Sequence, residues 1–195
     1  MSSLIGLPVP SVQLASTAGE TIDLASLAAE PLVIYLYPGT ETMPARAQDP
    51  DGLLRTSCTV QSQAFGEYAM DLGEWGVRVL GVSSRTVEEQ RRFAARERLP
   101  FSLASDVTLE LAAALDLPTS ITPSGDRVYK RMTLLASEGT IEWVFDPVPI
   151  PRRNAIDVLE WVMGRSPGFE EELEEELFTG GWECDLAAIP AELPI

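Results

Sequence analysis

The chain of 195 residues contains two cysteines and no histidine, and these two counts limit the chemistry that it could perform. Without an imidazole there is no Ser-His-Asp triad, no Cys-His pair and no histidine-ligated zinc or haem. Two thiols are also too few for a four-thiolate zinc or iron–sulfur site. The sequence therefore leaves carboxylate chemistry, a nucleophile that works without histidine, or no chemistry.

Cys58 lies where a long loop gives way to a predicted helix. In the first turn of a helix, unpaired N–H groups and the positive end of the helix dipole stabilise a thiolate. The alternative is a small buried hydrophobic residue, the common fate of a free cysteine. The neighbouring side chains are polar donors: Arg55, Thr56, Ser57 and Thr59. This setting favours a reactive thiol.

Arg131 is the second candidate, because it interrupts a predicted strand over residues 128–135 with a positive charge. Strand alternation puts it on the face shared by Tyr129, Thr133 and Leu135. A guanidinium over the end of the sheet could pair with a thiolate and hold an oxygen substrate by its fork of donors. The alternatives are an edge-strand charge that blunts aggregation, or a partner for a nearby carboxylate.

The elements that must position these residues alternate between strand and helix periodicity. The run at 32–37 is continuously apolar, which is typical of a central strand buried on both faces. The other predicted elements are a hairpin of 12–14 and 21–24, helix 58–72, strand 77–82, helix 86–98, strand 101–104, helix 109–115, a hairpin of 128–135 and 141–145, and helix 155–163. This order predicts an α/β fold, a thioredoxin-like three-layer sandwich with an N-terminal β-hairpin.

An acidic C-terminal extension follows a predicted boundary near residue 165. Residues 166–195 carry nine acidic side chains and no basic ones, so the net charge of −16 falls to −7 over residues 1–165. The charge opposes binding to nucleic acid and to anionic membranes. The chain carries no secretory leader pattern and no apolar run long enough to cross a membrane, so we expect a cytoplasmic protein of two parts, 1–165 and 166–195.

Three ordered segments resemble the peroxiredoxins, in particular the thiol-specific antioxidant branch that contains the bacterioferritin comigratory protein. The first comprises 7–14, 18–27 and 31–38, and it is similar to the opening strands of that family. The second, CTVQSQAF from Cys58, is similar to the family's C-T-x-E-x-x-x-F. The third, from Arg131 to Ile141, is similar to R-x-T-F-x-I-d-x-x-G-x-I and implies that Arg131 is the active-site arginine.

The chain departs from the family pattern P-x-x-x-T-x-x-C around Pro38. Here Pro38 and Cys58 are 20 residues apart instead of seven, which implies an inserted loop of 13 residues before the cysteine. Arg55 takes the place of the threonine, so the substrate-binding hydroxyl has two candidates, Thr42 and Thr56.

Two further departures concern the helix and the second thiol. Gln61 replaces the usual glutamate, and Gln63 occupies the position where this branch often has a resolving cysteine. The possible resolving thiol is Cys184, which lies 126 residues beyond Cys58 in the acidic extension.

The resemblance implies a thiol-dependent peroxidase that reduces hydrogen peroxide or organic hydroperoxides. The Cys58 thiolate would attack the peroxide, Arg131 would stabilise the charge on the leaving oxygen, and Cys58 would become a sulfenic acid. A thioredoxin-like protein, a small thiol or Cys184 would then reduce it. This chemistry implies no metal and no cofactor, in a monomer or a homodimer.

Two other functions fit parts of the sequence. The inserted loop and Arg55 would suit a thioredoxin-fold redox sensor or binding protein with little peroxidase turnover. The apolar residues of the acidic extension, spaced at 169, 173 and 177, would suit a chaperone-like holdase.

Overall fold

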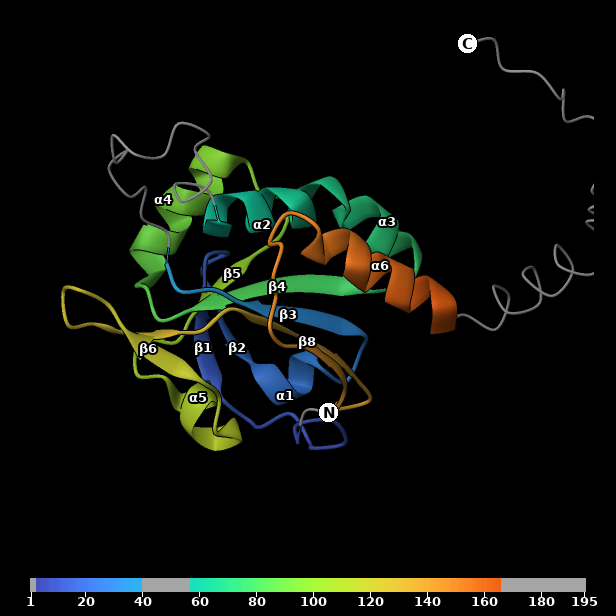
Figure 1. Ribbon diagram of the computed structural model, residues 1–195, viewed down its shortest axis with the longest axis horizontal. Coiled ribbons are helices and arrows are strands. Elements are labelled where there is room, and N and C mark those ends of the chain that lie inside the picture. The colour runs from blue at the N-terminus through green and yellow to red at the C-terminus, as the bar shows by residue number, and fades with distance from the viewer. Residues whose placement is uncertain (1–2, 40–56, 166–195) are drawn as a thin grey trace, which may run out of the picture.

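The computed structural model describes residues 3–39 and 57–165 (Figure 1). The inserted loop, Arg55, Thr42, Thr56, Cys184 and the acidic extension lie outside these residues.

The predicted apolar run at 32–37 forms β3 (Leu32–Leu36), the buried centre of the sheet. Side chains alternate across a strand, so Ile34 and Leu36 pack into one hydrophobic cluster and Val33 and Tyr35 into another on the opposite face. A strand between two cores has no polar face. This explains why the run contains only aliphatic residues and tyrosines, and it confirms the prediction.

Among the described residues, β3 belongs to a sheet of seven strands in the order β2-β1-β5-β4-β3-β8-β9. Strands β3, β4 and β5 run parallel, β8 pairs antiparallel with β3, and β9 pairs antiparallel with β8. The N-terminal hairpin pairs β1 with β2, and β1 joins β5. The other strands of this sheet are β1 (Gln13–Ser16), β2 (Thr21–Asp23), β4 (Arg78–Ser83), β5 (Leu103–Ser105), β8 (Met132–Ser137) and β9 (Thr140–Phe145).

Helices cover both faces of the sheet and complete the predicted three-layer sandwich (Figure 1). One face carries α2, α3, α4 and α6, and the other carries α1 and α5. The helices are α1 (Leu24–Leu27), α2 (Ser57–Glu67), α3 (Ala69–Glu74), α4 (Val87–Glu97), α5 (Glu110–Leu115) and α6 (Asn154–Arg165).

The helix predicted over 58–72 is two helices in the structure. The backbone of Tyr68 leaves helical geometry, with φ −97° and ψ 7°, and this residue separates α2 from α3. Phe65 and Leu72, on either side of the break, belong to the same hydrophobic cluster. Periodicity alone did not reveal it, because the apolar spacing continues across the break.

The strand predicted over 128–135 is also wrong as a single element. Residues Arg127–Tyr129 form β7, which pairs with β6 (Thr119–Ile121) in a separate two-stranded sheet. The chain then passes Lys130 and Arg131 before β8 joins the main sheet. Arg131 is therefore neither inside a strand nor on an edge. The strand β6, which lies between two prolines, was not predicted.

Candidate active site at Cys58 and Arg131

Cys58 is the second residue of α2 and the one cysteine among the described residues. It is half-buried and packs against the hydrophobic cluster that α2 shares with the central strand. This placement puts its sulfur in the first turn of an 11-residue helix, as predicted. The backbone N–H groups of that turn have no partners within the helix and can support a negative charge.

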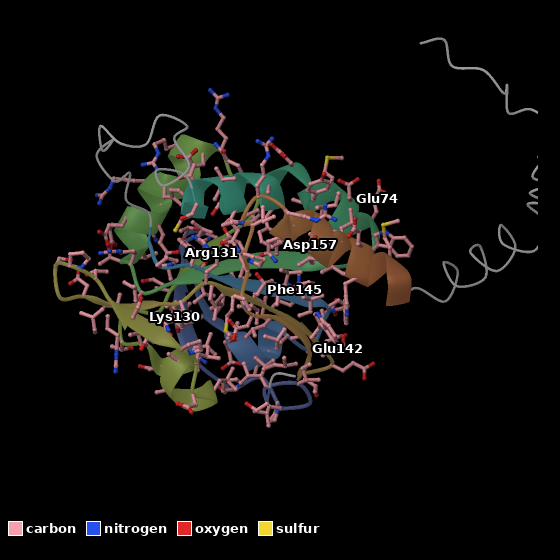
Figure 2. All side chains as sticks on the ribbon, viewed as in Figure 1. Glu74, Lys130, Arg131, Glu142, Phe145 and Asp157 are labelled. Carbon is pink, nitrogen blue, oxygen red and sulfur yellow. The ribbon has the colours of Figure 1, made fainter. Side chains whose placement is uncertain are left out.

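Arg131 reaches the first turn of α2 from the junction between β7 and β8 (Figure 2). Its Nη2 donates to Cys58 Sγ at 3.2 Å and to Ser57 Oγ at 3.0 Å, and its Nη1 donates to Gln61 Oε1. The guanidinium fork therefore spans one face of the helix. Arginine is suited to this geometry because its donors lie in a fixed plane and keep their charge at every relevant pH.

Sheet register brings these two segments together. Met132 is paired with Leu36, the last residue of β3, so Arg131 lies just beyond the carboxyl end of the central strand. Ligand sites in α/β proteins form at this end of the sheet, where strands give way to helices. Strand pairing thus brings together Cys58 and Arg131, which are 73 positions apart in the sequence.

A chain of buried polar groups continues from Arg131 into the protein. Gln61 Nε2 donates to Asn154 Oδ1 at 2.8 Å, and Thr133 Oγ1 donates to the same oxygen at 2.6 Å. Gln61, Thr133 and Asn154 are each at most 1% exposed. The chain links α2, β8 and the start of α6 behind the guanidinium.

Two buried tyrosines lie beside α2 and α4: Tyr35 on β3 and Tyr37 immediately after it. Tyr35 donates to Ser62 Oγ at 3.1 Å and stacks on Phe65, and Tyr37 donates to Gln90 Oε1 at 2.7 Å. Burial raises the pKa of both phenols well above their ordinary value of 10. Both hydroxyls therefore stay protonated and neutral at physiological pH, and neither presents a phenolate to compete with the thiol for Arg131.

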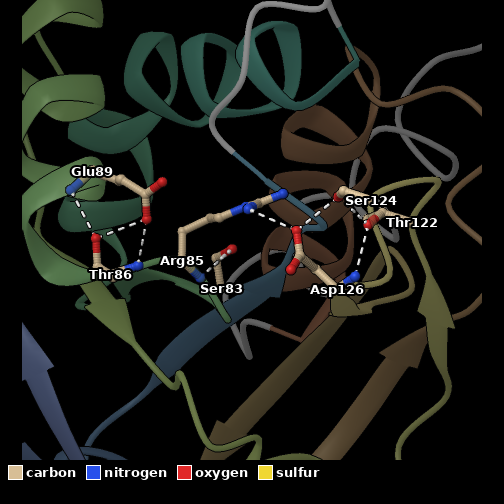
Figure 3. A network of polar contacts seen from close by, with 7 residues as sticks. All are labelled: Ser83, Arg85, Thr86, Glu89, Thr122, Ser124 and Asp126. Carbon is tan, nitrogen blue, oxygen red and sulfur yellow. Dashed lines mark hydrogen bonds and ion pairs between the residues drawn. The ribbon is translucent and has the colours of Figure 1, made fainter.

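Pro38 and Gly39 follow β3 and are half-buried beside the turn between β4 and α4. A Cβ at Gly39 would lie 3.2 Å from Arg85 Nε, so the arginine packs closely on this backbone. Arg85 Nη1 forms an ion pair with Asp126 Oδ2 at 3.7 Å, which comes from the turn between β6 and β7 (Figure 3). This contact connects the end of the central strand to the two-stranded sheet.

The turn that carries Asp126 is itself closed by polar contacts (Figure 3). The Ser124 hydroxyl donates to Asp126 Oδ2 at 2.8 Å, and the Asp126 N–H donates to Thr122 Oγ1 at 3.1 Å. On the other side of Arg85, Thr86 and Glu89 form a capping box at the start of α4. Arg85 therefore lies between two fixed turns.

Of the residues that the sequence singled out, the structure brings Cys58 and Arg131 into contact and places Pro38 at the end of the central strand. Thr42, Thr56 and Cys184 lie outside the described residues. Sequence reasoning assigned no site role to four residues that connect to the guanidinium. Ser57 and Gln61 contact it directly, Asn154 connects through Gln61, and Thr133 connects through Asn154.

A local signal existed for two of these missed residues. Ser57 and Gln61 are four apart on one helix, so they share the face that meets Arg131. Asn154 gave no local signal, since its contact with Gln61 spans 93 residues.

Metal ligands do not gather in the described part of the chain: residues 3–39 and 57–165 contain no group of three or more Cys, Asp, Glu or His residues placed to hold an ion. Over the same ranges, none of the helices has the length and apolarity needed to cross a bilayer.

Comparison with known proteins places the chain in the Redoxin family. A model of the Redoxin family matches residues 5–159. Peroxiredoxin Bcp of Escherichia coli is 27% identical over 156 residues, which cover 78% of this chain and 91% of the bacterial protein. The chloroplastic peroxiredoxin Q of Populus jackii is 26% identical over 157 residues, which cover 80% of this chain but only 66% of the plant protein.

The fold has close counterparts among solved structures. The bacterioferritin comigratory protein of Xanthomonas campestris, whose structures concern alkyl peroxide reduction, superimposes with a TM-score of 0.66 at 23% identity. The superposition covers 84% of this chain and 98% of that protein. At this level of identity the likeness establishes the shared architecture.

Proposed function

The chain belongs to the Redoxin family, and within its peroxiredoxin Q and Bcp branch we propose that it is a thiol-dependent peroxidase acting through Cys58 and Arg131. The observation that carries this proposal is the 3.2 Å contact between Arg131 Nη2 and Cys58 Sγ at the start of α2. One permanent charge and one helix terminus converge on a half-buried sulfur. This is the environment that makes a cysteine nucleophilic without a histidine.

The reaction would begin with attack of the Cys58 thiolate on the terminal oxygen of a peroxide. A sulfur–oxygen bond forms as the oxygen–oxygen bond breaks, and the leaving alkoxide or hydroxide takes a proton from solvent. Cys58 ends as a sulfenic acid, oxidised by two electrons, and the peroxide is reduced to an alcohol or water. Arg131 lowers the barrier because its donors meet the negative charge that develops on the departing oxygen.

Substrates of this reaction would be hydrogen peroxide and organic hydroperoxides. The alkyl peroxide reduction associated with the Xanthomonas campestris protein supports the second class. The half-buried position of Pro38 and Gly39 beside the carboxyl end of β3 supports a substrate site formed by that segment, with Thr42 or Thr56 supplying a hydroxyl.

Turnover would require a second thiol to reduce the sulfenic acid. A small thiol or a thioredoxin-like protein would serve as reductant in the cytoplasm, and Cys184 would be the resolving thiol if reduction begins within the protein. The catalytic domain would be residues 1–165, in agreement with a family match that ends at residue 159, and would act as a monomer or homodimer. Residues 166–195 would form a separate acidic extension.

A redox sensor with little turnover is the second candidate function. The specific observation in its favour is the 20-residue separation between Pro38 and Cys58, which lengthens the segment expected to bind peroxide. A sensor would form the sulfenic acid once and hold it, whereas a peroxidase would be reduced and react again.

The test is peroxide consumption by three purified proteins in the presence of excess dithiothreitol. Wild type should consume hydrogen peroxide continuously, Cys58→Ser should not, and Cys184→Ser should retain activity because dithiothreitol replaces the resolving thiol. Consumption by Cys58→Ser at the wild-type rate would disprove the proposed role of Cys58. A single turnover by wild type under excess reductant would support the sensor.

A further inference from the structure

Three polar side chains are buried behind Arg131, where apolar residues would pack at lower cost. Gln61, Thr133 and Asn154 come from α2, β8 and α6 and are essentially inaccessible to solvent. Burial of polar groups is unfavourable unless every one finds a hydrogen-bond partner. Their presence in the core therefore calls for a reason other than packing.

The donor and acceptor chemistry of these groups gives the series of hydrogen bonds a single direction. A guanidinium can only donate, so Gln61 must present its Oε1 to Arg131. The Gln61 NH2 group then faces Asn154 Oδ1, at 2.8 Å. With the Gln61 amide turned over, its NH2 group would oppose the guanidinium, donor against donor, and its oxygen would oppose the Asn154 oxygen.

The Asn154 oxygen is the fixed end of this arrangement. It accepts from Gln61 and from the Thr133 hydroxyl, which donates at 2.6 Å from the middle of the sheet. Thr133 belongs to β8, two residues after Arg131, so the chain of contacts returns to the same segment that carries the guanidinium. The result is a loop of hydrogen bonds that leaves Arg131 little freedom to turn away from α2.

We propose that Asn154 is a positioning residue, which acts through Gln61 to hold the Arg131 guanidinium against Cys58. The expected effect on the peroxide reaction rests on the proposed function, whereas the position of the guanidinium does not. Within residues 3–39 and 57–165, Asn154 is connected to the sulfur through Gln61 and Arg131. Its effect on the reaction would come entirely from the orientation of the Arg131 guanidinium.

The test compares two reactions of Cys58 in the full-length protein, with hydrogen peroxide and with the neutral alkylating reagent iodoacetamide. Both rates are taken on the alkaline plateau, where the thiol is fully ionised. Peroxide attack needs Arg131 at the departing oxygen, whereas alkylation needs only the thiolate. In Asn154→Leu, which removes the acceptor at similar volume, the peroxide rate should fall about tenfold, the worth of one oriented hydrogen bond, while alkylation should stay within about twofold.

Three further variants separate positioning from stability. Asn154→Asp keeps an acceptor for both donors and should restore the ratio of the two rates. Thr133→Val leaves the bond between Gln61 and Asn154 and should shift the ratio less than Asn154→Leu. Val158→Ala, in the buried face of α6, should weaken folding without changing the ratio.

An unchanged ratio in Asn154→Leu would overturn the proposal. A second measurement holds even if the protein proves not to be a peroxidase: hydrogen-exchange protection of the Arg131 guanidinium, followed by NMR. The guanidinium should be protected in wild type and Asn154→Asp and should exchange freely in Asn154→Leu. Equal protection in all three would remove Asn154 from this role, whereas slow peroxide chemistry in wild type would refute the proposed function alone.

Discussion

Replacement of Arg131 by methionine should slow the reaction of Cys58 with peroxide while preserving the fold. Methionine has a flexible stem that can fill much of the same space, but it has neither charge nor donors. The change removes the hydrogen bonds to Cys58, Ser57 and Gln61 together. The helix terminus remains, so the thiol loses only one of its two sources of stabilisation.

The size of the effect follows from the bond to the sulfur. A hydrogen bond to a charged group contributes about 1.5–3 kcal/mol. If this contribution is realised in the transition state, its loss slows the reaction by about 10- to 160-fold, since each 1.36 kcal/mol is a factor of ten. The buried Gln61 oxygen also loses its donor, which should lower the free energy of unfolding by about 1–3 kcal/mol.

Stopped-flow oxidation of Cys58 by hydrogen peroxide measures the first effect, and urea unfolding measures the second. Arg131→Lys should be intermediate, because an ammonium keeps the charge but cannot span three acceptors. Arg153→Met is the matched control, since Arg153 is an exposed arginine paired with Asp157 on α6. A rate for Arg131→Met within about threefold of wild type, well under the loss expected for a charged hydrogen bond, would refute the role given to Arg131.

Two other predictions concern the scaffold. Gly81→Ala should lower the free energy of unfolding by about 1–3 kcal/mol, because its Cβ would lie 2.5 Å from Tyr35 Cζ. Urea unfolding measures this loss, and an unchanged unfolding midpoint would show that the tyrosine ring moves aside at no cost. Thr86→Ala should cost about 1 kcal/mol through loss of the α4 cap. Hydrogen bonds from Thr86 also hold the pKa of Glu89 below its ordinary value of 4.5, so this stabilisation is present above that pH and is lost as the pH falls through the lower native pKa. Below pH 4.5, the free energy of unfolding of Thr86→Ala should therefore fall less steeply with decreasing pH than that of wild type. The same slope in both proteins would contradict the assignment.

The fold could be predicted largely because local pattern and tertiary environment agree. Residues 32–37 are apolar on both sides of the strand, and β3 is covered on both faces. The turn before β9 could also be predicted, because Glu138 and Gly139 form a short polar, glycine-containing segment of the kind that favours tight turns. Both residues adopt the positive φ of such a turn in the structure. Agreement of this kind made the order of elements predictable.

The failures occur where the identity of a partner decides the structure. β-forming residues lie on both sides of Lys130 and Arg131 in 128–135 and predict one strand, yet the chain changes sheets at these two residues. The sequence of this run does not indicate which strand will pair with each of its two parts. The same limit hid Asn154, whose polar side chain is explained only by donors that reach it from two other elements. Cys58 and Arg131, by contrast, were singled out by residue type together with their place in the predicted elements and their resemblance to the family's motifs.

The reaction rate of wild-type Cys58 with hydrogen peroxide tests the central claim most directly, when measured by stopped flow and followed by intact mass. The account predicts a rate orders of magnitude above that of free cysteine at the same pH. It also predicts a gain of about 16 mass units on Cys58 for the sulfenic acid, or a loss of two mass units if Cys184 closes a disulfide. A rate no greater than that of free cysteine would contradict it.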